Sequence, residues 1–498
     1  MSEDRLFDFS FNHAVKLRAE TPRVTADSGV LLLREADHRL GVTDALSAVL
    51  HDNRDQRFVR YSMVELLRER LYAFALGFSR QDDADRLAHD PAFKAAVWDR
   101  PGCGVADERL ASQPTSSRLV SLLAGWHNRE ELRKFLAEPV LRHQRQGGGE
   151  RRVSLGVVDI DGFPIEAHGE QQGAVYNGYY QKTVYSPLAA YFSANGDFDS
   201  KRLGEGFIHA ALRPGNAAPA EGMDLFLQYA IEKAGKLART VAFRLDAGFV
   251  SADILNHIDR AGARFTVRLP HNPALDNLAA PWLARPAGRP PKEGYEFTVE
   301  LTGYKNPGWD REYRVVLVVV DKPGKDGSLA LFPNYFFIAT NWTPERMPAR
   351  NLLTHYRQRG TFEDRLGEWN TLGVNLSQDS FAKNEVTLLL SMLAFNLLEI
   401  LRGEMESVAD PRPNPPYSPD KRGFDMTRFR TVVLKAGATL SRGGRRLWFD
   451  LAEGIAPLWR ALLTRLERWR RGERQTIPKP AFLMPPPRHA FQSFNPRM

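Results

Sequence analysis

The sequence predicts an α/β protein with a mixed β-sheet at its centre, a mostly helical amino-terminal region and a basic carboxy-terminal region. Strand-like and helix-like stretches alternate between residues 151 and 410, which is the pattern of a sheet covered by helices. Before residue 150, apolar residues recur at helical spacing. The chain has 498 residues, enough for about three domains.

The composition excludes several classes of protein. With 43% hydrophobic and 26% charged residues, the chain resembles ordinary globular proteins and not disordered or fibrous ones. Its single cysteine, Cys103, excludes a disulfide framework and any cysteine-based metal site. The first residues lack the basic-then-apolar pattern of a signal peptide. The apolar run Val386–Leu401 is too short and too polar for a membrane span, so we expect a buried helix, no membrane contact and a cytoplasmic location.

The net charge of +8 is unevenly distributed. Residues 420–498 contain 17 Lys and Arg and 6 Asp and Glu, so they carry +11, and the other 419 residues carry about −3. A basic end on a nearly neutral body is typical of a surface that binds a polyanion, although a solubilising surface has the same composition. Within this end, Trp459–Arg474 predicts a basic amphipathic helix that faces DNA, a partner subunit or a membrane surface.

Pro/Gly-rich stretches divide the chain. They are Gln146–Glu150, Pro270–Gly294 and Pro411–Pro419, and the last of them cannot continue a helix. Pro270–Gly294 reads as a connection. The breaks and the element pattern predict five parts, which are a helical region that binds DNA ends (1–150), a first core segment (151–270), a β-rich insertion (271–345), a second core segment (346–410) and a basic region for DNA or subunit contacts (411–498).

The amino-terminal part contains two recognisable helices. Met63–Ala75 has apolar positions at helical spacing, and the polar segment Leu110–Arg118 opens a second helix. A helix, turn and helix in this region could bind DNA. A plain helical bundle would produce the same pattern, and the sequence alone does not separate the two.

The first core segment reads as three meandering strands followed by helix, strand, helix and strand. The last part of that order is a βαβ unit, which implies parallel pairing with helices on the faces of the sheet. Asn195–Gly196 is a hairpin turn signal between the second and third strands. The predicted elements are the strands Val153–Asp161, Leu188–Ser193 and Phe207–Leu212, the helix Glu221–Leu237, the strand Val241–Asp246, the helix Ser251–Ala261 and the strand Phe265–Leu269.

Three further β-type runs follow. Tyr295–Leu301, Glu312–Val320 and Leu331–Thr340 have the spacing of an antiparallel insertion. Arg350–Trp369 then returns to a helical pattern. We therefore expect the sheet to be interrupted in sequence by a β-rich segment before the last helices.

Three carboxylates are candidates for a shared site. Asp161 ends the first core strand and Asp246 ends a later one, and ligand sites in open α/β sheets gather at the carboxyl ends of strands. Glu363 lies on the helix that follows the insertion. Asp159 competes with Asp161, because strand side chains repeat every two residues and both therefore share one face.

The helix that carries Glu363 has a polar stripe. On a continuous helix, Tyr356, Arg359, Glu363 and Asn370 fall within about 60° of one another, and this stripe borders the apolar face. A carboxylate in that position can meet an acidic pair that comes from the sheet. Asp364 is the next residue, but its side chain points about 100° away from that of Glu363.

These residue types suit the cleavage of phosphodiester bonds. Two divalent ions about 3.5–4 Å apart can stabilise the attacking and the leaving oxygen, and Mg²⁺ prefers carboxylate and water ligands. Arg359 could clamp a phosphate through two parallel hydrogen bonds, and Tyr356 could pack against a sugar or base. The alternative is that the aspartates are ordinary turn residues and the stripe is a solvated helix face.

Several segments resemble the DDE transposases of bacterial insertion sequences, specifically their thirteen-eighty group, and the resemblance runs over nearly the whole chain. Its strongest part is Tyr356, Arg359 and Glu363, which stand at the spacing of the family signature Tyr, two residues, Arg, three residues, Glu, six residues, Lys. Asn370 stands where the signature has lysine, and Gly162 follows Asp161 where relatives often have Thr or Ser. The other matching segments are Thr25–Leu33, Leu110–Thr115, Asp159–Asp161, His168–Gly173, Tyr176–Tyr180, Leu212–Asn216 and Arg244–Phe249.

The resemblance implies an RNase H-like catalytic core interrupted by a β-rich insertion. It implies a transposase that cuts DNA at terminal inverted repeats and joins the 3′-hydroxyl ends to target DNA, working as a homodimer on DNA. Asp161, Asp246 and Glu363 would be catalytic and, with Asp159, would hold Mg²⁺ or Mn²⁺ in its place. The residues expected to contact DNA are Tyr356, Arg359, Asn370, Arg460, Arg465, Arg468, Arg470 and Arg471.

Two other functions stay open. One is a metal-dependent endonuclease that does not transfer strands. The other is a DNA-binding protein that descends from a transposase and has lost catalysis. The presence of all three carboxylates argues against the second function, whereas Asn370 is the one feature in its favour.

Overall fold

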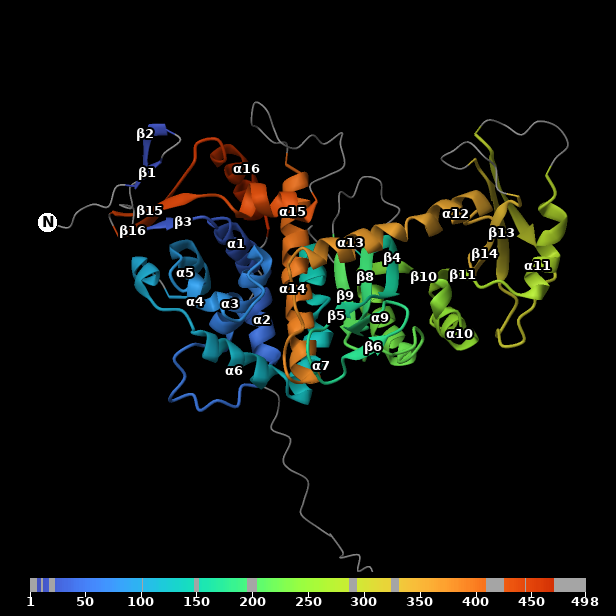
Figure 1. Ribbon diagram of the computed structural model, residues 1–498, viewed down its shortest axis with the longest axis horizontal. Helices are drawn as coiled ribbons and strands as arrows, with labels where there is room; N and C mark the ends of the chain where they lie inside the picture. Colours follow the sequence, from blue (N-terminus) through green and yellow to red (C-terminus); the bar gives the residue numbers. More distant parts are fainter. Residues whose placement is uncertain are drawn as a thin grey trace, which may run out of the picture.

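A computed structural model describes residues 7–9, 12–17, 23–100, 102–146, 152–194, 204–285, 293–323, 331–408, 425–443 and 445–469. Figure 1 shows a helical body on one side of helix α14 (Phe381–Glu406) and a large mixed sheet on the other. The predicted break Pro411–Pro419, the predicted turn Asn195–Gly196 and all but the first residue of the predicted break Gln146–Glu150 lie outside the described residues.

The first part of the chain is mostly helical, as predicted, although short strands precede the helices. In α3 the local sequence explains both ends, because Ser62 and Glu65 form a reciprocal capping box and Gly77 ends the helix with a φ of 88°. The elements are β1 Phe7–Phe9, β2 Asn12–Leu17, β3 Val24–Thr25, α1 Val30–Leu40, α2 Val42–Val49, α3 Met63–Leu76, α4 Asp83–Leu87, α5 Pro91–Val97, the 3₁₀ helix η1 Cys103–Asp107, α6 Gln113–Leu123, α7 Trp126–Phe135 and α8 Glu138–Arg145.

The two helices singled out from the sequence are α3 and α6. Helices α4 and α5 and the 3₁₀ helix η1 lie between them along the chain, so α3 and α6 are not joined by the short turn of a helix-turn-helix unit. Both pack against α14. The helices pack together as a bundle, but α6 and α7 are joined by only two residues, so DNA binding by this region stays a prediction.

Helix α14 is the centre of the helical body. All residues from Asn384 to Met405 are buried, and α1, α3, α6, α7, α8 and α16 pack around them. By length and hydropathy alone this helix could cross a membrane, but its apolar window is buried inside the protein throughout. The prediction of a buried helix over Val386–Leu401 is confirmed.

One buried polar residue joins α14 to the sheet. The side chain of Asn396 donates to the carbonyls of Leu136 and Phe207 and accepts from the amide of Phe207, at 2.8–2.9 Å. Phe207 lies on the edge strand β9, so α14 is hydrogen-bonded to both halves of the molecule. These bonds satisfy groups that would be costly to bury unpaired.

The large sheet has the strand order β12-β13-β14-β11-β10-β4-β8-β9. Strands β4, β10 and β11 are parallel, and the other neighbours are antiparallel. The predicted meander and βαβ unit are both present. The elements are β4 Val153–Gly162, β8 Leu188–Ala194, β9 Gly206–Ala211, α9 Met223–Leu237, β10 Ala238–Leu245, the 3₁₀ helix η2 Ala247–Phe249, α10 Ala252–Arg260, β11 Arg264–Leu269, β12 Tyr295–Leu301, β13 Arg314–Asp321, β14 Asn334–Thr340 and α12 Ala349–Arg357.

Helices cover both faces of the sheet. The buried side chains of α9 and α10 share one core with strands β4, β8, β10 and β11. On the other face, Leu352 and Leu353 of α12 pack on Val157, Ala242 and Val316. Strands buried on both faces read as nearly continuous apolar runs, which explains why the sequence showed them clearly.

The β-rich segment extends the central sheet. Its three strands pair antiparallel, as predicted, and β14 also pairs antiparallel with β11 of the core. The interpretation of Pro270–Gly294 as a plain connection is wrong, because it contains the helix α11 Pro273–Ala279 and the 3₁₀ helix η3 Ala280–Trp282. Asn272 caps α11 by accepting from the amide of Leu275, and Pro273 suits its first turn.

The prediction of one helix over Arg350–Trp369 is also wrong. The chain forms α12 and then α13 (Gly360–Asn370), which lie end to end in Figure 1. Between them, the amides of Arg359, Thr361 and Phe362 bond to the third residue back, as in a tightened turn. Gly360 has a low helix propensity, and it stands at this break.

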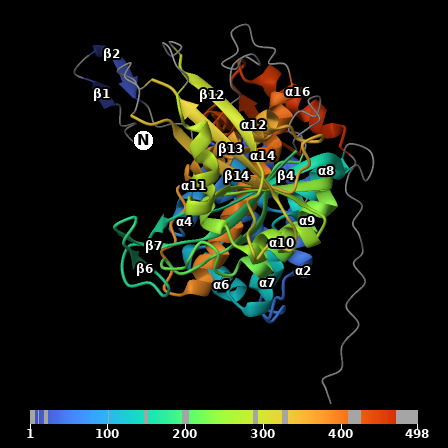
Figure 2. The ribbon, with the colours of Figure 1, turned by 90° about the vertical axis from the view of Figure 1, so that its right-hand side faces the viewer.

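A small second sheet has the order β5-β7-β6 and consists of β5 Ile165–Glu166, β6 Val175–Asn177 and β7 Lys182–Tyr185. Figure 2 shows β6 and β7 projecting from the body of the molecule. The carboxy-terminal part returns to the start of the chain, since β15 pairs with β3 and α16 packs on α1 and α14. Its elements are α15 Met426–Phe429, a π-helical turn Arg430–Leu434, β15 Ala438–Gly443, β16 Arg446–Leu451 and α16 Ala456–Glu467.

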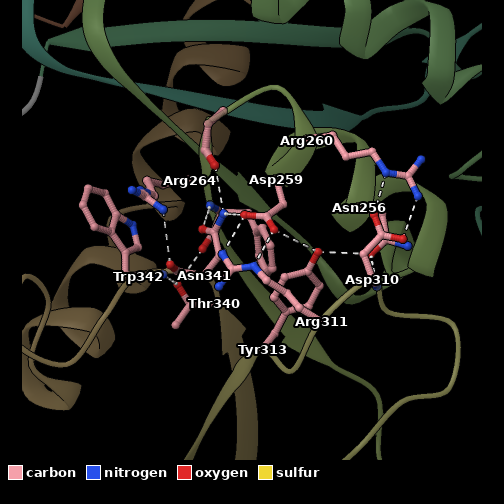
Figure 3. Close-up of polar contacts among 12 residues, drawn as sticks. Asn256, Asp259, Arg260, Arg264, Asp310, Arg311, Tyr313, Thr340, Asn341 and Trp342 are labelled. Atoms are coloured by element: carbon pink, nitrogen blue, oxygen red, sulfur yellow. Dashed lines mark hydrogen bonds and ion pairs between the residues drawn. The ribbon is translucent and has the colours of Figure 1, made fainter.

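A polar network fastens the added strands to the core, as Figure 3 shows. Asp259 of α10 accepts two hydrogen bonds from Arg311, at 2.7 and 2.8 Å, and one from Asn341 at 2.7 Å. Asn341 also donates to the carbonyl of Ala263 and accepts from the amide of Phe265, both at 2.9 Å. One buried side chain therefore satisfies groups from the helix, the loop and the strand around it.

We expect Asn341→Ala to destabilise the protein. The change leaves the buried amide of Phe265 and the buried carbonyl of Ala263 without a hydrogen-bond partner, which costs about 1–3 kcal/mol of folding stability for each group. Urea denaturation measures the loss, and the matched control is Asn334→Ala at the exposed start of β14, the strand that ends just before Asn341. Equal stability of the two variants would contradict the role of the network.

Candidate active site

Two aspartates stand at the carboxyl ends of the neighbouring parallel strands β4 and β10. Asp161 is the penultimate residue of β4, and Asp246 follows β10 directly, at the start of the short turn Ala247–Phe249. The parallel register pairs Arg244 with Asp159. The ladder ends at that pair, and Asp246 lies two residues beyond Arg244 just as Asp161 lies two residues beyond Asp159.

Arg359 joins Asp161 to Glu363. Its Nη2 donates to Oδ2 of Asp161 at 2.5 Å, and its Nη1 donates to Oε1 of Glu363 at 3.0 Å. The side chains of Arg359 and Asp161 are 12% and 19% exposed, whereas that of Glu363 is 63% exposed. The structure therefore brings α13 to the end of β4, with Glu363 at the rim of the site.

The charges of the site act on one another. The pKa of Asp161 is raised to about 6, chiefly by burial and also by the negative charges of Asp246 and Glu363, against the opposing effects of Arg359 and of the Gly162 amide. Burial also raises the pKa of Tyr356, and Asp246 and Asp161 add to that rise. Asp246 and Tyr356 therefore lie within electrostatic reach of the bridge that Arg359 makes.

The donor set suits a divalent cation. Carboxylate oxygens are the ligands that Mg²⁺ prefers, and three carboxylates lie within electrostatic reach of one guanidinium here. Among the described residues, no three acidic, histidine or cysteine groups already form a metal-binding cluster. The Arg359 guanidinium contacts two of the three carboxylates, so a cation would compete with it for their oxygens.

Asp159 has a different partner. Its two carboxylate oxygens accept from Nε and Nη2 of Arg244, at 2.7 and 2.5 Å, and both side chains are buried. Arg244 also donates to the backbone carbonyl of His355, so the pair ties β4, β10 and α12 together. This pairing favours a structural role for Asp159, and its role as a metal ligand stays a prediction.

Sequence reasoning missed Arg244 as a functional candidate. A signal was present, because Arg244 stands two residues before Asp246, and in a strand that spacing places both side chains on one face. Arg244 is buried, at 2% exposed, which makes its charge pairing with Asp159 obligatory.

Helix α13 is held firmly beside the site. Glu368 accepts from Arg402 of α14 at 2.6 Å, and the indole of Trp369 donates to Ser391 at 3.2 Å. Asn370 is exposed at the end of α13, and its position seven residues after Glu363 puts it on the same side of the helix. The geometry keeps Asn370 available for a ligand that extends along this face.

The predicted basic helix is α16, and it is placed apart from the acidic cluster, above the helical body in Figure 1. Its apolar side is buried in the core. Arg460 and Arg468 are exposed, whereas Arg465 forms an ion pair with Glu404 of α14. Arg470 and Arg471 lie outside the described residues, and the proposed DNA contacts of all five arginines stay predictions.

Comparison with known proteins identifies the family. None of the curated proteins matches the chain. A solved structure described as the cryo-EM structure of a piggyBac transposase synaptic complex with hairpin DNA aligns at 10% identity and a TM-score of 0.41, covering 82% of this chain and 80% of that one. The family model described as transposase DDE domain, group 1, matches residues 7–471. Since that match spans nearly the whole chain, the protein belongs to the DDE transposase domain family, group 1.

Proposed function

We propose that this protein is the transposase of a bacterial insertion sequence, in the thirteen-eighty group with its Tyr-Arg-Glu signature. It cuts phosphodiester bonds at the terminal inverted repeats and joins the 3′-hydroxyl ends to target DNA. Membership of a DDE transposase family supports a nuclease or transposition activity in general. The observation that carries the proposal is the meeting of Asp161 and Glu363 on one guanidinium, beside Asp246.

The strand order supports an RNase H-like core. Strands β9, β8, β4, β10 and β11 are adjacent in that order, with an antiparallel meander followed by two parallel additions. In this interpretation β12, β13 and β14 are the insertion, which has joined the sheet at β11. The proposal divides the chain at the same boundaries as the sequence prediction.

Each residue of the site has a proposed role. Asp161, Asp246 and Glu363 would hold Mg²⁺, or Mn²⁺ in its place, and such ions would supply stabilisation of the negative charge that develops during phosphodiester cleavage. Arg359 offers two N–H groups that a phosphate can accept in parallel, in exchange for the two carboxylates they contact now. Tyr356 packs against a sugar or base, and Asn370 contacts the DNA further along α13.

The same proposal places the protein in the cytoplasm as a homodimer on double-stranded DNA, with α16 and the basic carboxy-terminal region as additional DNA or subunit contacts. Two alternatives have specific support. An endonuclease without strand transfer needs the same three carboxylates. A DNA-binding protein without catalysis agrees with the replacement of the signature lysine by Asn370.

Cleavage of terminal-repeat DNA tests the proposal. We expect cleavage in Mg²⁺ and none in EDTA, followed by capture of a target plasmid. No cleavage by folded protein in Mg²⁺ would favour the DNA-binding alternative. Cleavage without capture of the plasmid would favour the endonuclease.

We expect Glu363→Gln to abolish cleavage and strand transfer while DNA binding is retained. Replacing even an outer partner of a metal ligand costs about 10–100-fold, so a lost ligand should cost at least about a hundredfold in rate. The matched control is Asp364→Asn, because Asp364 is exposed on the same turn of α13 but points elsewhere. Rate assays and band shifts measure the two effects, and retained activity in Glu363→Gln would remove that residue from the site.

We expect the stability effect of Asp161→Asn to depend on pH. The folded-state pKa of Asp161, about 6, lies above its ordinary value of 3.8, so ionisation costs the folded state stability as the pH rises from 4 to 6. In EDTA at pH 7, the free energy of unfolding of the variant should exceed that of the wild type by an amount on the order of 1–3 kcal/mol. This difference in stability should vanish near pH 4. Urea denaturation at both pH values measures this difference, with Asp364→Asn as the control. A difference in stability that is the same at both pH values would refute the raised pKa of Asp161.

A further inference from the structure

The small sheet grows from the edge that carries Asp161. In the large sheet Gly162, the last residue of β4, pairs with Leu188 at the start of β8. Three residues later Ile165 pairs with Tyr185, so the β5–β7 pair continues the same two chain segments past the end of the large sheet. The β6–β7 hairpin is therefore rooted beside the end of β4 that carries Asp161. Its tip comprises Tyr176 and Asn177, which end β6, and the turn 178–181.

The tip of this hairpin exposes three tyrosines. The exposed fraction is 63% for Tyr176, 88% for Tyr179 and 38% for Tyr180. The rings of Tyr179 and Tyr180 meet edge to face, with centroids 5.0 Å apart and planes at 86°. Because Tyr180 contacts Tyr179 in this geometry and Tyr179 is almost fully exposed, Tyr179 presents an aromatic face to solvent on a segment that projects from the molecule (Figure 2).

The tip is held in place by its own hydrogen bonds. Oδ1 of Asn177 accepts from the amides of Tyr179 and Tyr180, at 3.0 and 3.3 Å, and its Nδ2 donates to the carbonyl of Gly215 at 2.8 Å. A Cβ atom at position 215 would lie 2.1 Å from the carbonyl oxygen of Val184. The close approach of Gly215 to β7 therefore requires glycine. The tyrosines are presented by a preorganised turn, which lowers the entropy cost of binding a partner.

The charge of Asp161 also acts on one tyrosine of the tip. Burial raises the pKa of Tyr180, and the charges of Tyr179 and Asp161 raise it further. Tyr180 is therefore within electrostatic reach of the aspartate at the end of β4. Lys182, the first residue of β7, pairs with Glu166 at 2.6 Å with both side chains partly exposed, so it can turn towards a phosphate.

We propose that Tyr179 is a stacking platform for an unpaired base of the DNA strand that passes the acidic cluster, and that Tyr180 positions it. The inference rests on the proposed function, because that function brings a DNA strand to Asp161. Every base has a π face, so stacking on tyrosine tolerates any sequence.

The test uses the full-length protein in EDTA, where no cleavage occurs, and a short single-stranded oligonucleotide that carries 2-aminopurine. Stacking quenches the fluorescence of that base. Tyr179→Ala should lose the quenching and weaken binding about 5- to 150-fold, the range expected for one base on one aromatic ring. Tyr179→Phe keeps the π face and should behave like the wild type.

The matched control is Phe58→Ala, which removes another exposed ring, 83% exposed, from the loop between α2 and α3. Wild-type quenching in Tyr179→Ala, or an equal loss in Phe58→Ala, would overturn the inference. A change in self-association without a change in quenching would make the hairpin a contact between copies and would also overturn it. The proposed function can also fail by itself. That outcome would be quenching that is lost in Tyr179→Ala, together with no cleavage of DNA by the wild type in Mg²⁺.

Discussion

The contact on which the site depends is the pairing of one guanidinium with carboxylates from both a strand and a helix. Asp161, Asp246 and Glu363 repel one another, and burial of Asp161 strengthens that repulsion. Arg359 offsets it by bonding to Asp161 and Glu363 at once. In such an acidic centre, a metal ion can replace the guanidinium of Arg359 on the carboxylates. The freed guanidinium can then bind a phosphate.

The rest of the fold positions this contact. The buried Asp159–Arg244 pair locks the register of β4 against β10 and reaches the backbone of α12. The break at Gly360 ends α12 on the sheet and starts α13 at the end of β4. Helix α14 then holds α13 through Glu368 and Trp369, so the site is built where the helical body meets the sheet.

Much of this arrangement was predictable from the sequence, and the failures have physical causes. Strands buried on both faces are apolar throughout, and parallel strands end at the same edge, so the neighbourhood of Asp161 and Asp246 followed from the pattern. The helical periodicity of residues 350–369 persists through the break, because a tightened turn shifts side-chain angles only slightly. The Pro-rich stretch hid α11, since proline in a first turn favours a helix start as much as it marks a loop.

The sequence by itself determined the order of the strands of the large sheet and of helices α9 and α10, the buried character of α14 and the residue types of the acidic cluster, because periodicity and side-chain chemistry are local properties. Only the tertiary structure decided that Asp159 is occupied by Arg244, that Arg359 bridges residues distant in the chain, that β12, β13 and β14 join the central sheet, and that the basic helix α16 is anchored to the helical body. Those outcomes depend on which groups are buried next to each other. The two partners of each contact lie far apart in the chain, so no local stretch of sequence shows that they meet.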